Sequence, residues 1–196
     1  MIRWFYERLL LRDLNRPPEQ ICFMITGEDM LEAPEKIIEA TGWCREVGIQ
    51  GTTFHISTDQ PEQIRGCLPT IRRIGEIARL TLHYADTVET IGEGMEVTVA
   101  VGMSGREEIT ACIREIAREG AAPDEINEEM IERHLTFTCM PDLVIKTGGN
   151  YLTDFLIWQS VYSELFFLDV NWKWFRKVDF LRAIRDYQSR ARRFGT

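Results

Sequence analysis

The sequence has few of the residues from which metal centres and disulfide frameworks are built. Its 196 residues include three histidines and five cysteines, and no CxxC pair or Cys/His cluster occurs among them. Zinc ligation and a disulfide framework are therefore both poor interpretations. An odd number of widely spread thiols is typical of buried cysteines in a reducing compartment. These thiols belong to Cys22, Cys44, Cys67, Cys112 and Cys139.

Long apolar segments are also lacking. No run approaches the roughly 18 apolar residues that a membrane span needs, and the N-terminal region lacks the apolar core and cleavage site of a signal peptide. We therefore expect a cytoplasmic protein. The formal net charge of −8 argues against nucleic-acid binding, which requires a basic surface. A chain of this length with 44% hydrophobic residues can bury a core of its own, so we expect one domain over residues 1–196.

Alternating helix and strand patterns predict an α/β fold. Short apolar or β-branched segments are expected to form strands at residues 21–25, 51–57, 96–101, 143–147 and 164–170. Helices are expected at residues 3–14, 34–47, 61–84, 105–120, 154–162 and 177–193, with another helix capped by Asp124. The first lies in an N-terminal segment, residues 1–18, and the last opens a basic C-terminal segment, residues 177–196. Such alternation implies a mostly parallel β-sheet flanked by helices.

Small or polar residues follow three of the predicted strands, at Thr26-Gly27, residues 57–60 and residues 146–150. The carboxyl ends of parallel strands meet at one edge of the sheet, where ligands bind in folds of this kind. These three loops would therefore gather at a candidate site. The alternative is that they only form turns and helix caps, and for any one loop the two interpretations weigh equally.

The last third of the chain contains four motifs in a fixed order. They read PDLVIKTGG at Pro141–Gly149, DFLIWQ at Asp154–Gln159, YSELFF at Tyr162–Phe167 and RRFG at residues 192–195. This series resembles the C-terminal signature of the cis-prenyltransferases, the undecaprenyl and dehydrodolichyl diphosphate synthase family. Weaker agreement upstream, including Ser57–Gln60 and the Gly105-Arg106 turn, extends the resemblance over essentially the whole chain.

The resemblance implies a parallel sheet flanked by helices, assembled as a dimer. It also implies a reaction in which isopentenyl diphosphate is added to an allylic diphosphate to give Z double bonds. Two diphosphates are then held side by side, and Mg²⁺ offsets the charge of the one that leaves.

The phosphate site of the family is degenerate at its first strand. Aligned on Gly27, the position of the aspartate that anchors Mg²⁺ in the family is Thr26. A neutral hydroxyl does not replace a carboxylate as a ligand of a hard cation, and the following segment is shorter than the phosphate loop of the family. Glu28 or Asp29 is a candidate substitute; the simpler interpretation is a solvated turn or an early helix cap.

Cations are also missing from two other family positions. Gln60 and Gln63 stand where the family has an asparagine and an arginine, and neither carries a charge for a phosphate. At the predicted strand of residues 143–147 the family has an arginine, with a second arginine and then a serine a few residues later, where this chain has Lys146, Tyr151 or Leu152, and Thr153. With Gly148 and Gly149, Lys146 and Thr153 are the predicted substrate-binding residues, although lysine binds phosphate only as a point charge.

Two family features are retained. Glu164 matches the second carboxylate of the metal site, and residues 193–195 match the R-x-G tail. In the family this tail completes the diphosphate site of the opposite subunit, so Arg193 and Gly195 are predicted to act in a partner's site. The simpler alternative for Arg193 is a solvated charge at a helix C-terminus.

The combination predicts an auxiliary, non-catalytic subunit of a heteromeric cis-prenyltransferase, of the Nogo-B-receptor type. Its partner would be a catalytic subunit that holds most of the Mg²⁺ site and binds the isoprenoid diphosphates. The alternatives are a self-sufficient homodimeric enzyme of divergent specificity and a catalytically dead scaffold. The basic C-terminal segment is compatible with peripheral contact with an anionic membrane and, more simply, with a solvated helix face.

Overall fold

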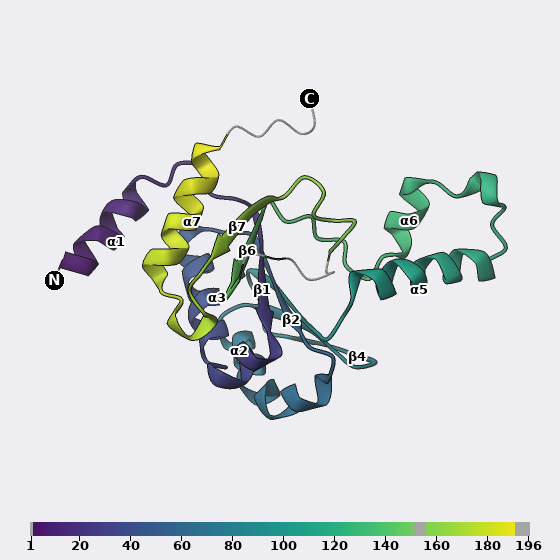
Figure 1. Ribbon diagram of the computed structural model, residues 1–196, viewed down its shortest axis with the longest axis horizontal. Coiled ribbons are helices and arrows are strands. Elements are labelled where there is room, and N and C mark those ends of the chain that lie inside the picture. Colours follow the sequence, from purple (N-terminus) through teal and green to yellow (C-terminus); the bar gives the residue numbers. More distant parts are fainter. Residues whose placement is uncertain (1, 150, 152–155, 191–196) are drawn as a thin grey trace.

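Seven strands form one sheet, and each neighbouring pair except β3–β4 is parallel (Figure 1). This computed structural model describes residues 2–149, 151 and 156–190, with only the backbone described for residues 2–6. The strand order is β4-β3-β5-β2-β1-β6-β7. The strands are β1 (Gln20–Thr26), β2 (Gly51–Ser57), β3 (Arg79–Tyr84), β4 (Thr87–Ile91), β5 (Glu96–Val101), β6 (Leu143–Thr147) and β7 (Glu164–Leu168). The predicted α/β class with a mostly parallel sheet is confirmed.

The α-helices are α1 (Ile2–Arg12), α2 (Gly27–Glu32), α3 (Lys36–Val47), α4 (Leu68–Arg72), α5 (Gly105–Arg118), α6 (Glu128–His134) and α7 (Lys177–Ser189). Helix α1 precedes the first strand, α7 follows the last, and the other α-helices lie between strands in the chain. Short 3₁₀ helices cover Pro61–Cys67, Arg73–Glu76, Pro123–Glu125 and Trp172–Trp174. In Figure 1, α5 and α6 form a hairpin that projects from the sheet, whereas α3 and α7 lie close to it. Among the described residues, none of the helices has the length and apolar content required to span a bilayer.

The main core lies on one face of the central strands. Phe23 of β1 stacks on Phe54 of β2 with ring centroids 5.0 Å apart, and Trp172, Phe175 and Phe180 surround Phe23 at centroid distances of 6.1–6.2 Å. All five side chains are fully buried. The continuous apolar sequence of β1 is explained by this position, because a central parallel strand is buried on both faces.

The prediction of one helix over residues 61–84 is wrong. The segment contains short 3₁₀ and α-helical turns up to Glu76, followed by β3. The apolar spacing changes within the segment. Ile64, Leu68 and Ile71 follow a helical spacing, whereas Leu80 and Leu82 alternate with exposed or half-buried residues, which is the period of a strand. Strand β4, a short edge strand that pairs antiparallel with β3, was not predicted.

A tight connection allows β4 to be followed directly by β5 without a crossover helix. This connection passes the start of β3, where the Met95 carbonyl accepts a hydrogen bond from the Arg79 N–H at 2.9 Å. Gly92 lies in it with φ +80°. A Cβ atom at Gly92 would approach the carbonyl oxygens of Gly75 and Ala78 to 2.3 and 2.4 Å, so this position requires glycine.

Two further predicted elements differ in the structure. The helix expected over residues 154–162 falls partly outside the described residues, and its described part, residues 156–162, consists of bends and turns, with Leu156 at φ 50°. Asp124 lies in a 3₁₀ helix, and the cap of α6 is instead Asn127, whose side-chain oxygen accepts from the Met130 N–H at 3.0 Å. The last predicted helix ends at Ser189 within the described chain.

Candidate functional site at the carboxyl edge of the sheet

Thr26 ends β1 at the predicted edge and caps the six-residue helix α2. Its N–H and its hydroxyl both donate to Asp29 Oδ2, at 3.1 and 2.8 Å. The Asp29 N–H in turn donates to Thr26 Oγ1 at 3.1 Å. This reciprocal pair is a capping box, with Thr26 as the N-cap and Asp29 at the third position of the helix. Asp29 thus belongs to a helix cap, which was the alternative to its role as a substitute Mg²⁺ ligand. Packing at Gly27 is tight, because a Cβ atom there would lie 3.0 Å from Thr58 Cβ.

Gln60 and Gln63 follow β2 at the same edge and are both exposed. Their side-chain amides are hydrogen-bonded to each other, and the Gln60 N–H donates to Thr58 Oγ1 at 3.1 Å. The pair is neutral and internally satisfied, so it brings no charge to an anionic ligand.

Lys146 lies on β6 beside β1, where its register partner is Met24. The residue is only 2% exposed, and Nζ donates to the Thr147 carbonyl oxygen at 2.9 Å. The ring centroid of Tyr151 lies 5.9 Å from the ammonium, within the range of a cation–π contact. Burial lowers the pKa of Lys146, and the Asp29 carboxylate partly offsets this effect. A positive charge is thus present at the edge, although it lies beneath the surface.

The Gly148-Gly149 turn follows β6, with φ values of 67° and 149°. The Gly148 N–H donates to the carbonyl oxygens of Leu168 and Val170, both at 3.1 Å. This N–H therefore joins the end of β6 to the end of β7, and its hydrogen-bonding capacity is used within the protein.

Glu164 lies at the opposite edge of the sheet. It is the first residue of β7 and pairs with Leu143, the first residue of β6, whereas Lys146 pairs with Phe167. Three residues of strand, about 10 Å, separate the rows of Glu164 and Lys146. The Glu164 carboxylate receives a hydrogen bond from Arg190 at 2.9 Å. Within one chain, Glu164 and Lys146 therefore do not meet.

The predicted residues Arg193, Gly195 and Thr153 lie outside the described residues. Arg190, where the described chain ends, contacts Glu164 and also donates to the Leu165 carbonyl oxygen at 3.2 Å. The described end of α7 therefore lies at the amino edge of the sheet, away from Lys146.

The side chains at the carboxyl edge do not fit a Mg²⁺ site. Magnesium requires oxygen ligands arranged octahedrally, usually from carboxylates, waters and phosphates. Thr26 and one oxygen of Asp29 are engaged in the capping box, and Glu164 is on the other edge. In the described part of the chain, no group of three or more metal-ligating side chains occurs.

Apolar side chains fill the space beside the degenerate loop. Ile25, Met30, Ile56 and Ile64 are each at most 1% exposed, and a Cβ atom on Gly27 would lie 3.6 Å from Ile64 Cδ1. These contacts leave the core close-packed directly below the edge.

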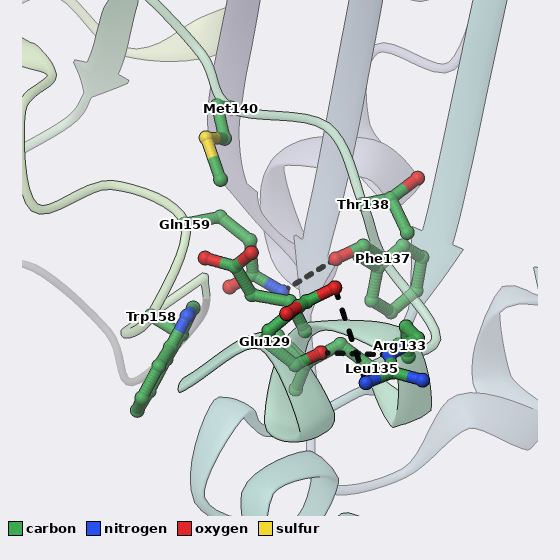
Figure 2. A pocket seen from close by; sticks show the side chains of 9 residues that line it. Glu129, Arg133, Leu135, Phe137, Thr138, Met140, Trp158 and Gln159 are labelled. Carbon is green, nitrogen blue, oxygen red and sulfur yellow. Dashed lines mark hydrogen bonds and ion pairs between the residues drawn. The ribbon is translucent and has the colours of Figure 1, made fainter. Parts of the chain in front are cut away.

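One polar network was missed by the sequence analysis. Glu108 of α5 is 8% exposed and accepts hydrogen bonds from the Phe137 N–H at 2.8 Å and from Gln159 Nε2 at 3.2 Å. Gln159 Nε2 also donates to the Phe137 carbonyl oxygen at 2.6 Å (Figure 2). The motif that contains Gln159 was recognised from the sequence, but the burial of a single glutamate among exposed helix residues leaves no sequence signal.

Comparisons with known proteins agree with the motifs. Residues 62–195 match a family described as "Putative undecaprenyl diphosphate synthase". The chain is 33% identical to an isoprenyl transferase of Thermus thermophilus, with 98% of this chain and 95% of the relative covered. It is 39% identical to a (2Z,6E)-farnesyl diphosphate synthase of Thermobifida fusca, with 97% and 95% covered. The first alignment runs over 250 residues, more than the length of this chain, so segments of that relative have no counterpart here.

A solved structure shows the same fold. Lavandulyl diphosphate synthase from Lavandula x intermedia, in complex with dimethylallyl diphosphate, aligns with a TM-score of 0.73 and 20% identity over 92% of this chain and 99% of that chain. Together with the family match and the sequence relatives, this places the chain plainly: it belongs to the cis-prenyltransferase family of isoprenoid diphosphate synthases.

The buried ammonium at the edge gives a testable pH dependence. Because the folded-state pKa of Lys146 is lowered, the unfolded chain binds this proton more tightly, and stability rises with pH from the lowered pKa up to about 10.4. We expect wild type to gain stability relative to Lys146→Met over that range. Urea denaturation of both proteins between neutral pH and pH 10.5 measures the difference. Parallel stability curves would contradict the burial of a charged lysine.

Proposed function

We propose that this chain is an auxiliary subunit of a heteromeric cis-prenyl diphosphate synthase. Its own pocket does not carry out prenyl transfer, and its tail, through Arg193 and Gly195, completes the diphosphate site of a catalytic partner. That partner holds most of the Mg²⁺ site and binds the isopentenyl and allylic diphosphates. The complex works in the cytoplasm, where its lipid product favours a position near the membrane.

The main support is the separation of degenerate and retained positions. Thr26, Gln60, Gln63 and Lys146 differ from the family pattern, and they lie at or next to the carboxyl edge of the sheet. Glu164, which matches the pattern, lies at the amino edge, where Arg190, just after α7, binds it. Glu164, the retained residue within the described chain, thus lies away from the degenerate positions.

The packing below the edge also supports an auxiliary role. A growing isoprenoid chain needs an apolar cavity next to the diphosphate that it carries. Met30 and Ile64 are fully buried at that place, and filling such a packed core further would cost about 1–3 kcal/mol or more in strain.

The proposal is tested by assaying the chain alone, the partner alone and the mixture with isopentenyl and farnesyl diphosphates and Mg²⁺. The partner to use is the chain that co-purifies from the native host and carries the Mg²⁺-anchoring aspartate of the family at the position of Thr26. We expect elongation in the mixture and little or none with this chain alone. Vigorous synthesis by this chain alone would refute the auxiliary role.

A second candidate function is a self-sufficient homodimeric enzyme. The observation in its favour is that the Asp29 carboxylate raises the pKa of Lys146, against the larger effect of burial. One carboxylate and one ammonium group therefore remain near each other at the carboxyl edge. Calorimetry distinguishes the two, because tight, Mg²⁺-dependent binding of a farnesyl diphosphate analogue to the lone chain belongs only to the self-sufficient enzyme.

A further inference from the structure

The hairpin of α5 and α6 is held together by a small set of contacts. It projects from the sheet in Figure 1, and its apolar side chains form a separate small cluster, in which Cys112, Ile116 and Leu135 are the buried members. Helix α6 has seven residues, too few to be stable without tertiary contacts. Segments with few buried apolar contacts open locally at a small cost in free energy. One polar contact is therefore enough to shift the balance between a docked and a released α6.

His134, the last residue of α6, makes two polar contacts. Its Nδ1 lies 2.8 Å from the Met130 carbonyl oxygen of the same helix, and its Nε2 lies 3.1 Å from Glu119 Oε2. Glu119 directly follows α5 and is its C-cap. The imidazole is 18% exposed and the carboxylate 60%. The ring thus joins the end of one helix of the hairpin to the end of the other, and we call this pair of contacts the His134 clasp.

The two contacts together require a protonated ring. A carbonyl oxygen and a carboxylate only accept hydrogen bonds, whereas a neutral imidazole has a single N–H donor. In either neutral tautomer, the lone pair of one ring nitrogen would face an oxygen, and that contact would be lost. Only the imidazolium donates from both nitrogens. In agreement, the Met130 carbonyl and then the Glu119 carboxylate raise the pKa of His134, against the effect of burial.

The other ionisable groups around the ring leave this preference in place. Glu115 of α5 also raises the pKa of His134. Arg133, the preceding residue of α6, lies 4.0 Å from the Glu129 carboxylate, which offsets its positive charge (Figure 2). The Cys112 thiol of α5, which contacts α6, has a raised pKa and is therefore neutral near pH 7. The charge of the clasp thus changes with the ring of His134 itself.

We propose that the His134 clasp is a pH-sensitive device that holds α6 on α5 while the ring is protonated and releases α6 when the ring is neutral. The docked hairpin binds the proton more tightly than a released one. The clasp therefore acts fully below the ordinary histidine pKa of about 6.5, and it is lost as the pH rises through the higher pKa of the docked state. Histidine is the side chain whose charge ordinarily changes in this range. The inference is independent of the proposed auxiliary role, because both contacts lie within one chain.

Amide hydrogen exchange of the full chain, followed by mass spectrometry, measures the release of α6. The protection of the α6 amides in wild type is divided by that in His134→Gln at the same pH, which cancels the intrinsic pH dependence of exchange. We expect this ratio to fall about two- to fivefold between about pH 6 and about pH 9, as befits a partly exposed ionic contact. A ratio that stays constant over this range would overturn the proposal.

Two matched variants separate the clasp from a general effect of charge. Glu119→Gln removes the carboxylate of the clasp, and it should lower the midpoint of the His134 ring titration, read by NMR, and reduce the pH-dependent change in α6 protection. Glu132→Gln removes an exposed carboxylate of α6 that is not a partner of the ring, and it should leave both quantities nearly unchanged. Equal effects of the two variants would overturn the proposal, because the ring would then respond only to net charge.

A coincidence of two titrations ties the release to this histidine. The backbone resonances of α6 should shift with the same midpoint as the His134 ring. The pKa of His83 is lowered by burial, so a change driven by that residue would appear at lower pH. If the α6 resonances follow the midpoint of His83, or fail to shift as the His134 ring titrates, the clasp is not the group that holds α6.

Discussion

Replacing Arg193 with alanine is expected to lower the turnover of the mixed complex by roughly one to three powers of ten. The proposed role of this side chain is to bring a positive charge to a diphosphate in the partner's site, and a guanidinium binds phosphate by two parallel hydrogen bonds that alanine cannot form. The measurement is the steady-state rate of isopentenyl diphosphate incorporation, made with the complex at fixed composition.

Arg192→Ala is the matched control, since it removes the neighbouring arginine and leaves the R-x-G motif intact. It should retain most of the activity. Sedimentation must show that both variants still associate with the partner, so that a lost rate reports the site and not the assembly. Unchanged turnover of the Arg193 variant would contradict the proposed role of the tail in the partner's site and would favour a chain that serves only as a scaffold.

Phe23→Ala is expected to reduce the free energy of unfolding by about 3–5 kcal/mol. Phe23 is fully buried at the centre of the aromatic cluster, stacked on Phe54 and contacted by Trp172. Alanine would leave a cavity that rigid neighbouring rings cannot fill. Urea denaturation of the lone chain gives the value, from the midpoint and the slope of the transition.

The matched control for this prediction is Phe167→Ala, the same change at a side chain that is 40% exposed on β7. Its cost should be less than half that of Phe23→Ala, because less apolar surface returns to water. Equal costs would show that the aromatic cluster around Phe23 contributes no more to stability than surface burial does.

The parts of the fold that were predictable are those in which local pattern and tertiary position agree. Residues 21–25 and 143–145 are apolar without interruption because β1 and β6 are inner parallel strands, buried on both faces. Residues 79–84 were misread because a helical spacing upstream continues into an alternating one, and the nearby Gly75 lies inside the last 3₁₀ turn and does not mark the boundary at Arg79. Strand β4 has a largely exposed pattern, so its pairing with β3 left little trace in the sequence.

The candidate site was predictable only in part for a similar reason. That the loops after β1, β2 and β6 share one edge follows from parallel strands. The capping box of Thr26 and Asp29, the mutual hydrogen bond of Gln60 and Gln63 and the burial of Lys146 depend on where side chains turn after the backbone is placed. Residue identity alone does not fix those orientations.

The placement of Glu164 and Thr26 at opposite ends of one sheet has a consequence for how such a subunit would change over generations. Substitutions around Thr26 would be invisible to selection as long as the helix start stays capped, whereas substitutions around Glu164 and Arg190 would be tested in every complex that forms. The sequence near Thr26 would then vary freely, whereas the sequence near Glu164 and Arg190 would be constrained. In a random mutagenesis screen of the two-subunit enzyme, inactivating substitutions on the surface of this chain should fall mainly near Glu164 and Arg190.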